Sequence, residues 1–206
     1  MENMQGIFID KIFYTLDDLE KDCWLRLVNG TLRSKDAFHT ASVATLKGAD
    51  ISLRTVVLRK ALPSEKLLHF NTDVRSPKWN ELKVNNTTSM LFYNFSSRIQ
   101  LRVSGFATLH HKDDIADIAW EKTALNSRRC YLTKNAPSSI IEFPSKEFEK
   151  SNKPESILQI ESEAGRKNFG VVNVHVQSMD WLWLNHAVHH RALFDYANQK
   201  YVWIAP

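Results

Sequence analysis

The sequence has few cysteines and no long apolar run. Its 206 residues include two cysteines, Cys23 and Cys130, which are far apart and outside any Cys-x-x-Cys motif. Small apolar packing residues are therefore a better interpretation of both than redox or zinc ligands. No apolar stretch approaches the ~20 residues that a membrane-spanning helix needs. The first residues also lack the basic and apolar regions of a secretory signal. We therefore expect a reducing, cytoplasmic setting.

The sequence also lacks strong charge and a dinucleotide motif. The formal net charge of +4 permits an anionic ligand but is too small and too scattered to indicate nucleic-acid binding. No Gly-x-Gly-x-x-Gly run occurs, which argues against a Rossmann dinucleotide site. Six tryptophans and eleven phenylalanines could stack on bases, but no RNA-recognition signature accompanies them. Core packing is the favoured interpretation of these aromatic residues.

A histidine-rich C-terminal segment raises the question of a metal site. A zinc site needs about four converging ligands, and no cysteine or carboxylate stands at a supporting spacing. Strand alternation would also send His189 and His190 to opposite faces. We expect no metal, and interpret the histidines as polar turn residues or as one histidine beside a bound cofactor. The residues considered are His110, His111, His186, His189 and His190.

The composition is that of a folded domain. Hydrophobic residues make up 43% and charged residues 24%, a balance that predicts one globular domain over residues 1–206. A helix is expected over residues 16–32, because Thr15 and Asp18 can form a capping box at its start. Apolar residues then recur at helical spacing from Leu16 onward.

Alternating residues predict an antiparallel sheet. From Phe38 the apolar period changes to two, and turn residues at 47–50 and 96–97 join neighbouring strands into hairpins. Many short strands with few helices indicate an α+β protein built on an antiparallel barrel. The expected strands cover residues 38–46, 51–59, 67–71, 89–95, 99–109, 169–176, 181–184, 192–196 and 201–204. Helices are expected over 77–84, 113–123 and beside 126–131, and a polar loop with one short helix over 144–168.

The polar segment from Asn71 to Lys78 is a candidate anion site. It supplies two cations, Arg75 and Lys78, together with hydroxyl groups and the start of a helix. Free N–H groups and the helix dipole favour an anion at such a start, and arginine and lysine complete a phosphate site. The alternative is an exposed, capped turn whose charges only keep it in solution.

The neighbouring strand Arg54–Arg59 favours the phosphate interpretation. Arg54 lies on one face of this strand and Arg59 on the other, among apolar residues. Because an unpaired buried charge is costly, the two arginines need an anionic partner. One phosphate-bearing ligand would satisfy this strand and the segment from Asn71 to Lys78, with its apolar ring along the strand backbone.

Four segments stand in order along the chain: Arg54–Arg59, Phe70–Lys78, Gln100–Gly105 and Trp181–Arg191. In this order and spacing they are similar to the flavin mononucleotide (FMN) binding segments of the pyridoxamine 5′-phosphate oxidase-like family. The Arg-Ser-Pro-Lys run at residues 75–78 most resembles a bacterial and cyanobacterial branch of that family, distinct from the true vitamin B6 oxidases. The similarity spans roughly residues 16–206.

The resemblance implies a split β-barrel homodimer with FMN between its subunits. It also implies an oxidoreductase that transfers a hydride between a small substrate and the flavin N5. Arg59 stands where the family usually has lysine, near flavin and substrate. The implied phosphate ligands are Arg54, Arg75, Ser76 and Lys78. The implied contacts to the rest of the flavin are Thr55, Val56, Val57, Arg59, Asn71, Thr72, Gln100, Trp181 and Arg191, some of them from the second subunit.

The match weakens at the substrate end of the site. True oxidases carry an Arg-x-His-x-Arg arrangement, and here His189 and Arg191 match it whereas Ala187 replaces the first arginine. A lost charged contact to substrate weakens binding and catalysis strongly, which argues against vitamin B6 oxidation. The implied substrate-binding residues are Arg59, Trp120, Arg129 and His189.

Alternatives to a flavin enzyme stay open from sequence. The helix near Trp120 and Arg129 could equally carry surface arginines and a packed tryptophan, without any substrate. No side chain is assigned as an obligatory acid or base, because the cofactor supplies the chemistry. A flavin carrier or sensor without turnover is one alternative. A barrel that binds deazaflavin or haem is another.

Overall fold

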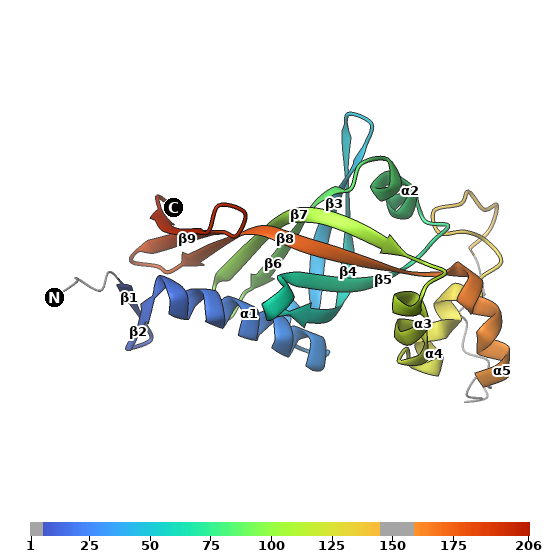
Figure 1. The fold of residues 1–206 in the computed structure, drawn as a ribbon, viewed down its shortest axis with the longest axis horizontal. Coiled ribbons are helices and arrows are strands. Elements are labelled where there is room, and N and C mark those ends of the chain that lie inside the picture. Colours follow the sequence, from blue (N-terminus) through green and yellow to red (C-terminus); the bar gives the residue numbers. More distant parts are fainter. Residues whose placement is uncertain (1–5, 145–158) are drawn as a thin grey trace.

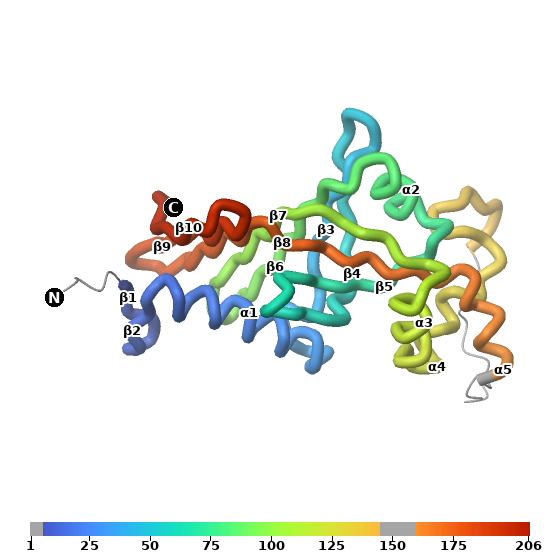
Figure 2. Tube along the Cα trace, in the orientation of Figure 1, coloured from blue at the N-terminus to red at the C-terminus, as the bar shows by residue number. Residues whose placement is uncertain are grey.

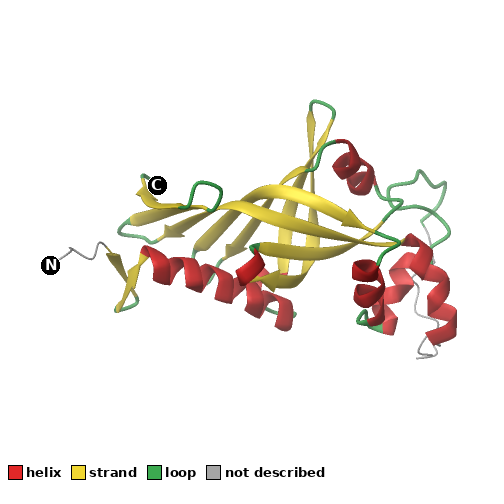
Figure 3. Cartoon of the chain, viewed as in Figure 1, coloured by secondary structure: helices red, strands yellow, loops and turns green. Residues whose placement is uncertain are grey.

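The computed structural model describes residues 6–144 and 159–206. Figure 1 shows a long twisted sheet flanked by helices, and Figure 3 shows the same arrangement by element type. The strands are β1 (Gly6–Ile9), β2 (Ile12–Thr15), β3 (Thr40–Lys47), β4 (Asp50–Leu62), β5 (Leu67–Asp73), β6 (Thr87–Asn94), β7 (Ile99–His110), β8 (Phe169–Leu184), β9 (His189–Asp195) and β10 (Lys200–Ile204). The helices are α1 (Leu16–Leu32), α2 (Pro77–Val84), α3 (Asp114–Glu121), α4 (Leu125–Arg128) and α5 (Gln159–Ser162).

Helix α1 begins and ends where the sequence predicts. The amide of Asp18 donates to Thr15 Oγ1 at 3.2 Å, and the Asp18 carboxylate accepts from the Thr15 amide at 3.1 Å. This reciprocal capping satisfies N–H groups that would otherwise lack partners at the helix start. Its apolar face, which includes Leu19 and Cys23, is fully buried in the main core. Cys23 is therefore a packing residue, as expected, whereas Cys130, for which the same was expected, is exposed.

The main sheet is antiparallel and closes on itself. Its strand order is β10-β9-β8-β5-β4-β3-β6-β7, and β7 also pairs with β8. Strands β3 to β8 therefore form a barrel, while β9 and β10 extend from β8 beyond it. The predicted α+β class is confirmed, and this topology is consistent with a split barrel. The N-terminal hairpin β1–β2, which the sequence did not predict, lies at the same end as β9 and β10 (Figure 2).

Strand β8 corrects one prediction. Residues 169–176 and 181–184 were expected to form two strands, but they belong to a single strand of 16 residues. Its first half pairs with β5 and its second half with β9, while β7 follows it on the other edge. The polar residues between the halves, which include Gln177 and Ser178, resemble a turn in sequence. In the structure Ser178 pairs with Ser104 of β7 and Asp195 of β9, and Gln177 is the extra residue of β8 at the register shift between β7 and β8.

The barrel interior is the main core, and a second cluster lies outside it. Phe70, Phe92 and Trp181 are among the large side chains buried inside. Burying each such side chain stabilises the fold by roughly 1.5–3 kcal/mol. On the outer side of β8, Trp120 of α3 packs with Phe169 in the second cluster. This cluster attaches α3 to the barrel.

The remaining helices follow their predictions closely. Helix α2 has the predicted bounds, α3 falls within the expected segment 113–123, and α4 overlaps the start of the expected segment 126–131. Part of the predicted loop over 144–168 lies outside the described residues, and α5 is the short helix in the part that is described. Within 6–144 and 159–206, none of the helices combines the length and apolar character needed to cross a bilayer.

Candidate functional site

Three polar side chains meet where β5 ends and α2 begins. Lys78 Nζ donates to Thr72 Oγ1 at 2.9 Å and lies 3.4 Å from Ser76 Oγ. Thr72 and Ser76 are buried. The Ser76 hydroxyl donates to the Asp73 carbonyl at 2.6 Å and does not cap α2. In the described part of the chain, no carboxylate lies within ion-pairing distance of Lys78. We call Thr72, Ser76 and Lys78 the α2 anion group.

Arg54 approaches the same end of the barrel and has an internal partner. Its Nη2 donates to Glu81 Oε2 at 2.8 Å, and Thr45 Oγ1 donates to the same oxygen at 2.5 Å. Burial raises the pKa of the Glu81 carboxyl, but the hydrogen bonds from Thr45 and Arg54 outweigh it and leave this pKa below its ordinary value. The anionic partner that the sequence left open for Arg54 is thus Glu81 on α2.

The electrostatics at Lys78 fit an anionic ligand. Burial and the nearby positive charge of Arg54 lower the pKa of the Lys78 ammonium. Two like charges at a partly buried site repel each other, and a phosphate beside them would relieve that repulsion. Together with the two hydroxyl groups, this donor set fits the phosphate of FMN.

Arg75 is engaged elsewhere. Its guanidinium pairs with the Asp73 carboxylate at 2.7 Å and donates to the Thr133 carbonyl at 2.9 Å. It thereby ties the end of β5 to the segment after α4. Arg75 was predicted to hold phosphate together with Lys78, and the structure gives it this tying role within the chain.

A cavity of about 310 Å³ opens on the outer face of β4 and β5. It brings together Arg59 and Asn71, which the sequence proposed, with Lys60 and Lys122, which it missed. None of the lining residues is acidic, so the cavity is strongly cationic. We call it the β4–β5 cavity. Its lining residues are Thr31, Arg59, Lys60, His69, Asn71, Ala119, Lys122, Thr123, Ala124 and Ser127.

A polar chain crosses the floor of this cavity. His69 Nε2 lies 2.9 Å from Asn71 Oδ1, and Asn71 Nδ2 makes a long contact of 3.5 Å with Thr123 Oγ1. The Thr123 hydroxyl in turn donates to the Ala119 carbonyl at 2.8 Å. Burial, opposed by the bond to Asn71 and reinforced by the charge of Lys60, lowers the pKa of His69 to about 4. No sequence motif indicated His69.

Trp120 and Arg129 are not among the residues that line the β4–β5 cavity. Trp120 is buried in the second cluster, where its Nε1 donates to Glu163 at 2.9 Å. The interpretation as a packed tryptophan therefore describes it better than substrate binding does. Periodicity placed both residues on the correct helical segments but could not tell which face of α3 meets the cavity.

The flavin contacts proposed on β4 divide between its two faces. Val56 is buried in the barrel core, whereas Thr55 and Val57 face outward beside Arg59. Val56 could thus offer a ligand its backbone but no side-chain surface. The alternation predicted from the sequence for this strand agrees with the pattern of burial.

Gln100 and Arg191 share one face of the sheet, but Trp181 does not. Both pair in register with Leu182 of β8, so their side chains project to the same side. Trp181 pairs instead with Leu101 and is fully buried in the core. A flavin contact at Trp181 is therefore not supported. The spacing of ten residues to Arg191 suggested proximity but did not reveal the register.

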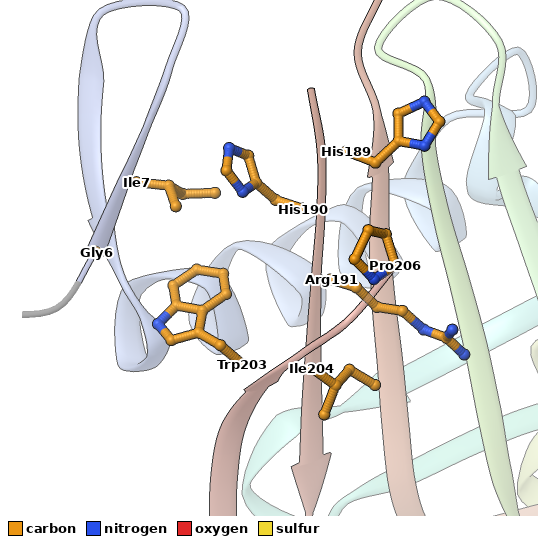
Figure 4. A pocket seen from close by; sticks show the side chains of 8 residues that line it. All are labelled: Gly6, Ile7, His189, His190, Arg191, Trp203, Ile204 and Pro206. Carbon is orange, nitrogen blue, oxygen red and sulfur yellow. The ribbon is translucent and has the colours of Figure 1, made fainter. Parts of the chain in front are cut away.

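A second cavity, of about 340 Å³, lies beside Arg191. It separates the hairpin β1–β2 from β9 and β10, and His189, also proposed from sequence, is among its lining residues. In Figure 4 the His190 ring points toward Ile7 of β1, and the Arg191 side chain points away from that residue. The Arg191 guanidinium makes two bonds to the Asp180 carboxylate, at 3.0 and 2.8 Å.

The proposed residues thus form two groups in one chain. The α2 anion group and the β4–β5 cavity belong to one part of the barrel, and Gln100, His189 and Arg191 to the extension around β9. In Figure 1, α2 and β9 are well separated along the long axis. A single chain does not bring the two groups together.

Residues 21–111 match the family model of the pyridoxamine 5′-phosphate oxidase FMN-binding domain. The resemblance to this family is confirmed. The matched stretch contains the α2 anion group, Arg59 and Gln100. No curated protein matches the chain in sequence.

Solved structures with low sequence identity share the fold of this chain. One is a pyridoxamine 5′-phosphate oxidase-related, FMN-binding protein from Nostoc punctiforme, with a TM-score of 0.69, 23% identity, and coverage of 90% of this chain and 96% of that one. Another is PhzG from Burkholderia lata, in complex with tetrahydrophenazine-1-carboxylic acid, with a TM-score of 0.66, 15% identity, and coverage of 96% and 99%. A third, from Clostridium acetobutylicum, is related to general stress protein 26, with a TM-score of 0.54, 12% identity, and coverage of 88% and 99%.

Proposed function

We propose that this chain is an FMN-binding oxidoreductase. The observation that carries the proposal is the α2 anion group, in which a partly buried ammonium and two buried hydroxyl groups lack a carboxylate partner in the described residues. That group lies inside the segment that matches the FMN-binding domain. A phosphate is the ligand that this donor set and that family have in common.

The chain's own residues would hold and orient the cofactor. Lys78, Ser76 and Thr72 would bind the phosphate, while Arg54, fixed by Glu81, would add positive potential behind them. Thr55 and Val57 face outward on the stretch of β4 that leads from Arg54 to Arg59, and would contact the remainder of the molecule. When bound, FMN supplies hydride transfer at its N5, which no side chain can provide.

The substrate would enter the β4–β5 cavity. Arg59, Lys60 and Lys122 line it without an acidic residue, so a substrate with a carboxylate or phosphate group is favoured. The ligand in the PhzG structure is itself a carboxylic acid, which is in keeping with that class. Ala187 replaces an arginine of the true oxidases, and pyridoxamine phosphate is therefore not the substrate we propose.

The functional unit would be a homodimer. Gln100 and Arg191 lie far from the α2 anion group in the same chain, so a second copy would be needed to bring them to the flavin. Leu53, Leu91 and Tyr93 on the outer faces of β4 and β6 are 67%, 40% and 42% exposed. Burying such apolar side chains between two copies would stabilise a dimer.

The absorption spectrum of the purified protein tests the cofactor. We expect a yellow protein that releases FMN on denaturation. A Soret band would indicate haem, and released deazaflavin would also contradict the proposal. A colourless protein that fails to bind added FMN would exclude both the enzyme and a flavin carrier. Mixing the FMN-loaded protein anaerobically with carboxylate-bearing and phosphate-bearing donors then separates enzyme from carrier. If none of these donors reduces the flavin, the carrier is favoured.

The first mutational prediction concerns Lys78. We expect Lys78→Ala to weaken FMN binding at least about tenfold, because a charge-assisted bond to phosphate is lost. Lys83→Ala, on the exposed last turn of α2, is the matched control and should leave FMN affinity unchanged. Fluorescence titration gives the affinities and thermal melting checks the fold. Undiminished affinity in a folded Lys78→Ala protein would contradict the phosphate assignment.

A further inference from the structure

The β4–β5 cavity contains a buried histidine whose role the proposed function does not explain. His69 is 3% exposed and stands on the outer face of β5, opposite Lys60 of β4 and Asn173 of β8. Its ring bonds sideways to Asn71 Oδ1 at 2.9 Å, and Asn173 also acts on it as a hydrogen-bonding side chain. Its hydrogen-bonding partner, Asn71, is a neutral polar residue of the cavity floor.

The surroundings of His69 keep it neutral. The charged or titratable groups that act on it are Lys60 from β4 and His110 from β7, and Lys122 lines the same cavity from the end of α3. Burial and these neighbours lower its pKa to about 4. A neutral imidazole carries a single N–H. The Asn71 oxygen accepts at 2.9 Å from Nε2, which places that N–H on Nε2, and Asn173 on β8 is a further side-chain partner of the ring.

The orientation of the Asn71 amide follows from its other neighbour. The Thr123 hydroxyl donates its only hydrogen to the Ala119 carbonyl, so its oxygen can only accept from Asn71. The NH2 group of Asn71 therefore faces Thr123 and the cavity, while its oxygen faces His69. One N–H of that group remains for a ligand. In the reverse orientation the Asn71 oxygen would face the Thr123 oxygen, and neither atom would have a hydrogen to donate to the other.

We propose that His69 is a positioning residue that fixes the Asn71 amide so that the β4–β5 cavity presents a hydrogen-bond donor, beside its cations, to a deprotonated acid group. The cavity then selects against neutral groups that must themselves donate. This inference rests on the proposed function at one point, namely that the substrate enters the β4–β5 cavity. The donor arrangement itself belongs to the chain with or without FMN.

The tautomer of His69 is the direct test. In protein with 15N-labelled histidine, we expect His69 at pH 7 to give the NMR signature of a neutral ring protonated on Nε2. A ring protonated on Nδ1, or an imidazolium at that pH, would overturn the proposal. Loss of FMN binding would contradict the proposed function yet leave this result unchanged, so the two failures are distinguishable.

Ligand selection is the second test, with benzoate as the probe and benzamide as its neutral counterpart. Shifts of the Asn71 side-chain amide report binding at this cavity. We expect the wild type to bind benzoate more tightly than benzamide. His69→Phe should weaken benzoate binding about tenfold, because the amide is released. His69→Gln, which keeps a donor, should stay within about twofold of the wild type.

The control is His175→Phe, which removes a hydrogen-bonded histidine from the same face of the barrel without touching the cavity. It should leave benzoate binding unchanged. Equal affinities in the wild type and a folded His69→Phe would overturn the proposal, as would a wild type without preference for benzoate. If His69→Phe does not fold, the benzoate affinity of His69→Gln and the tautomer of His69 are the deciding measurements. An affinity within about twofold of the wild type and a proton on Nε2 support the proposal, and the opposite results overturn it.

Discussion

At the scale of single residues, Glu81 is a buried charge held by two partners. Its carboxylate is buried on α2 and accepts from Arg54 and Thr45. Removing one partner of such a pair leaves an uncompensated buried charge, which destabilises a protein far more than removing both. Arg54 therefore supports the fold of this end of the barrel as well as the potential at Lys78.

This asymmetry gives a stability prediction. Arg54→Met should lower the free energy of unfolding by roughly 3–5 kcal/mol, and adding Glu81→Gln should recover most of the loss. Arg102→Met is the matched control. It breaks a half-exposed pair with Asp180 and should lower stability by about 1 kcal/mol or less. Urea unfolding gives the free energies of unfolding of the wild type and the three variants. A double variant no more stable than Arg54→Met would contradict the buried-charge explanation.

The same pair predicts acid sensitivity. The pKa of Glu81 in the folded chain is below its ordinary value of 4.5, so the unfolded chain binds the proton more readily. The stabilisation is therefore complete above that ordinary value and is lost as pH falls toward the folded pKa. Unfolding measured between pH 7 and 3 should show a shallower fall in stability for Glu81→Gln. An identical pH profile would exclude Glu81 as a source of the acid sensitivity.

At the scale of elements, the fold depends on how β7 follows β8. The register between them shifts at Ser104/Gly105, close to where β8 passes from pairing with β5 to pairing with β9. A Cβ atom at Gly105 would lie 2.0 Å from the His175 carbonyl oxygen. Backbone approaches of this kind admit only glycine. The bulge lets one long strand serve both the barrel and its extension.

Gly105→Ala should therefore destabilise the chain by about 1–3 kcal/mol or more, because β7 and β8 must separate to admit the methyl group. Ser104→Ala, at the exposed neighbouring position, should stay within about 0.5 kcal/mol of the wild type. Urea unfolding measures both. If Gly105→Ala is as stable as Ser104→Ala, then β7 and β8 can separate at this point without loss of stability, and the prediction is wrong.

The same elements show what sequence can and cannot predict. Local rules were enough for α1, since Thr15 and Asp18 cap it directly, and alternation gave the two faces of β4. Residues near Gln177 look like a turn because they are polar. Their strand partners on β7 and β9 are remote in sequence, so no local pattern reveals the continuous strand. Remoteness also hid the register that turns Trp181 away from Arg191, and the position of His69 in a cavity built by β4, β5 and α3. Contacts between distant segments decide these features, and no local pattern encodes them.

At the scale of the whole molecule, the proposed site needs two chains. A dimer with twofold symmetry would join the α2 anion group of each copy to Gln100 and Arg191 of the other, giving two equivalent sites. Lys78→Ala damages the first half of a site and Arg191→Ala the second half. In a mixed dimer of these variants, both changes fall in one site and the other site is intact.

Co-expression of the two variants with different affinity tags therefore tests the assembly. The mixed dimer should bind about one FMN per two chains at wild-type affinity, although neither parent binds well. Lys78→Ala mixed with Ser76→Ala is the matched control, because both changes fall in the same half and each site keeps one defect. If every chain held its own FMN, the two mixtures would bind equally poorly. Recovery in the first mixture alone follows only from an FMN site divided between subunits.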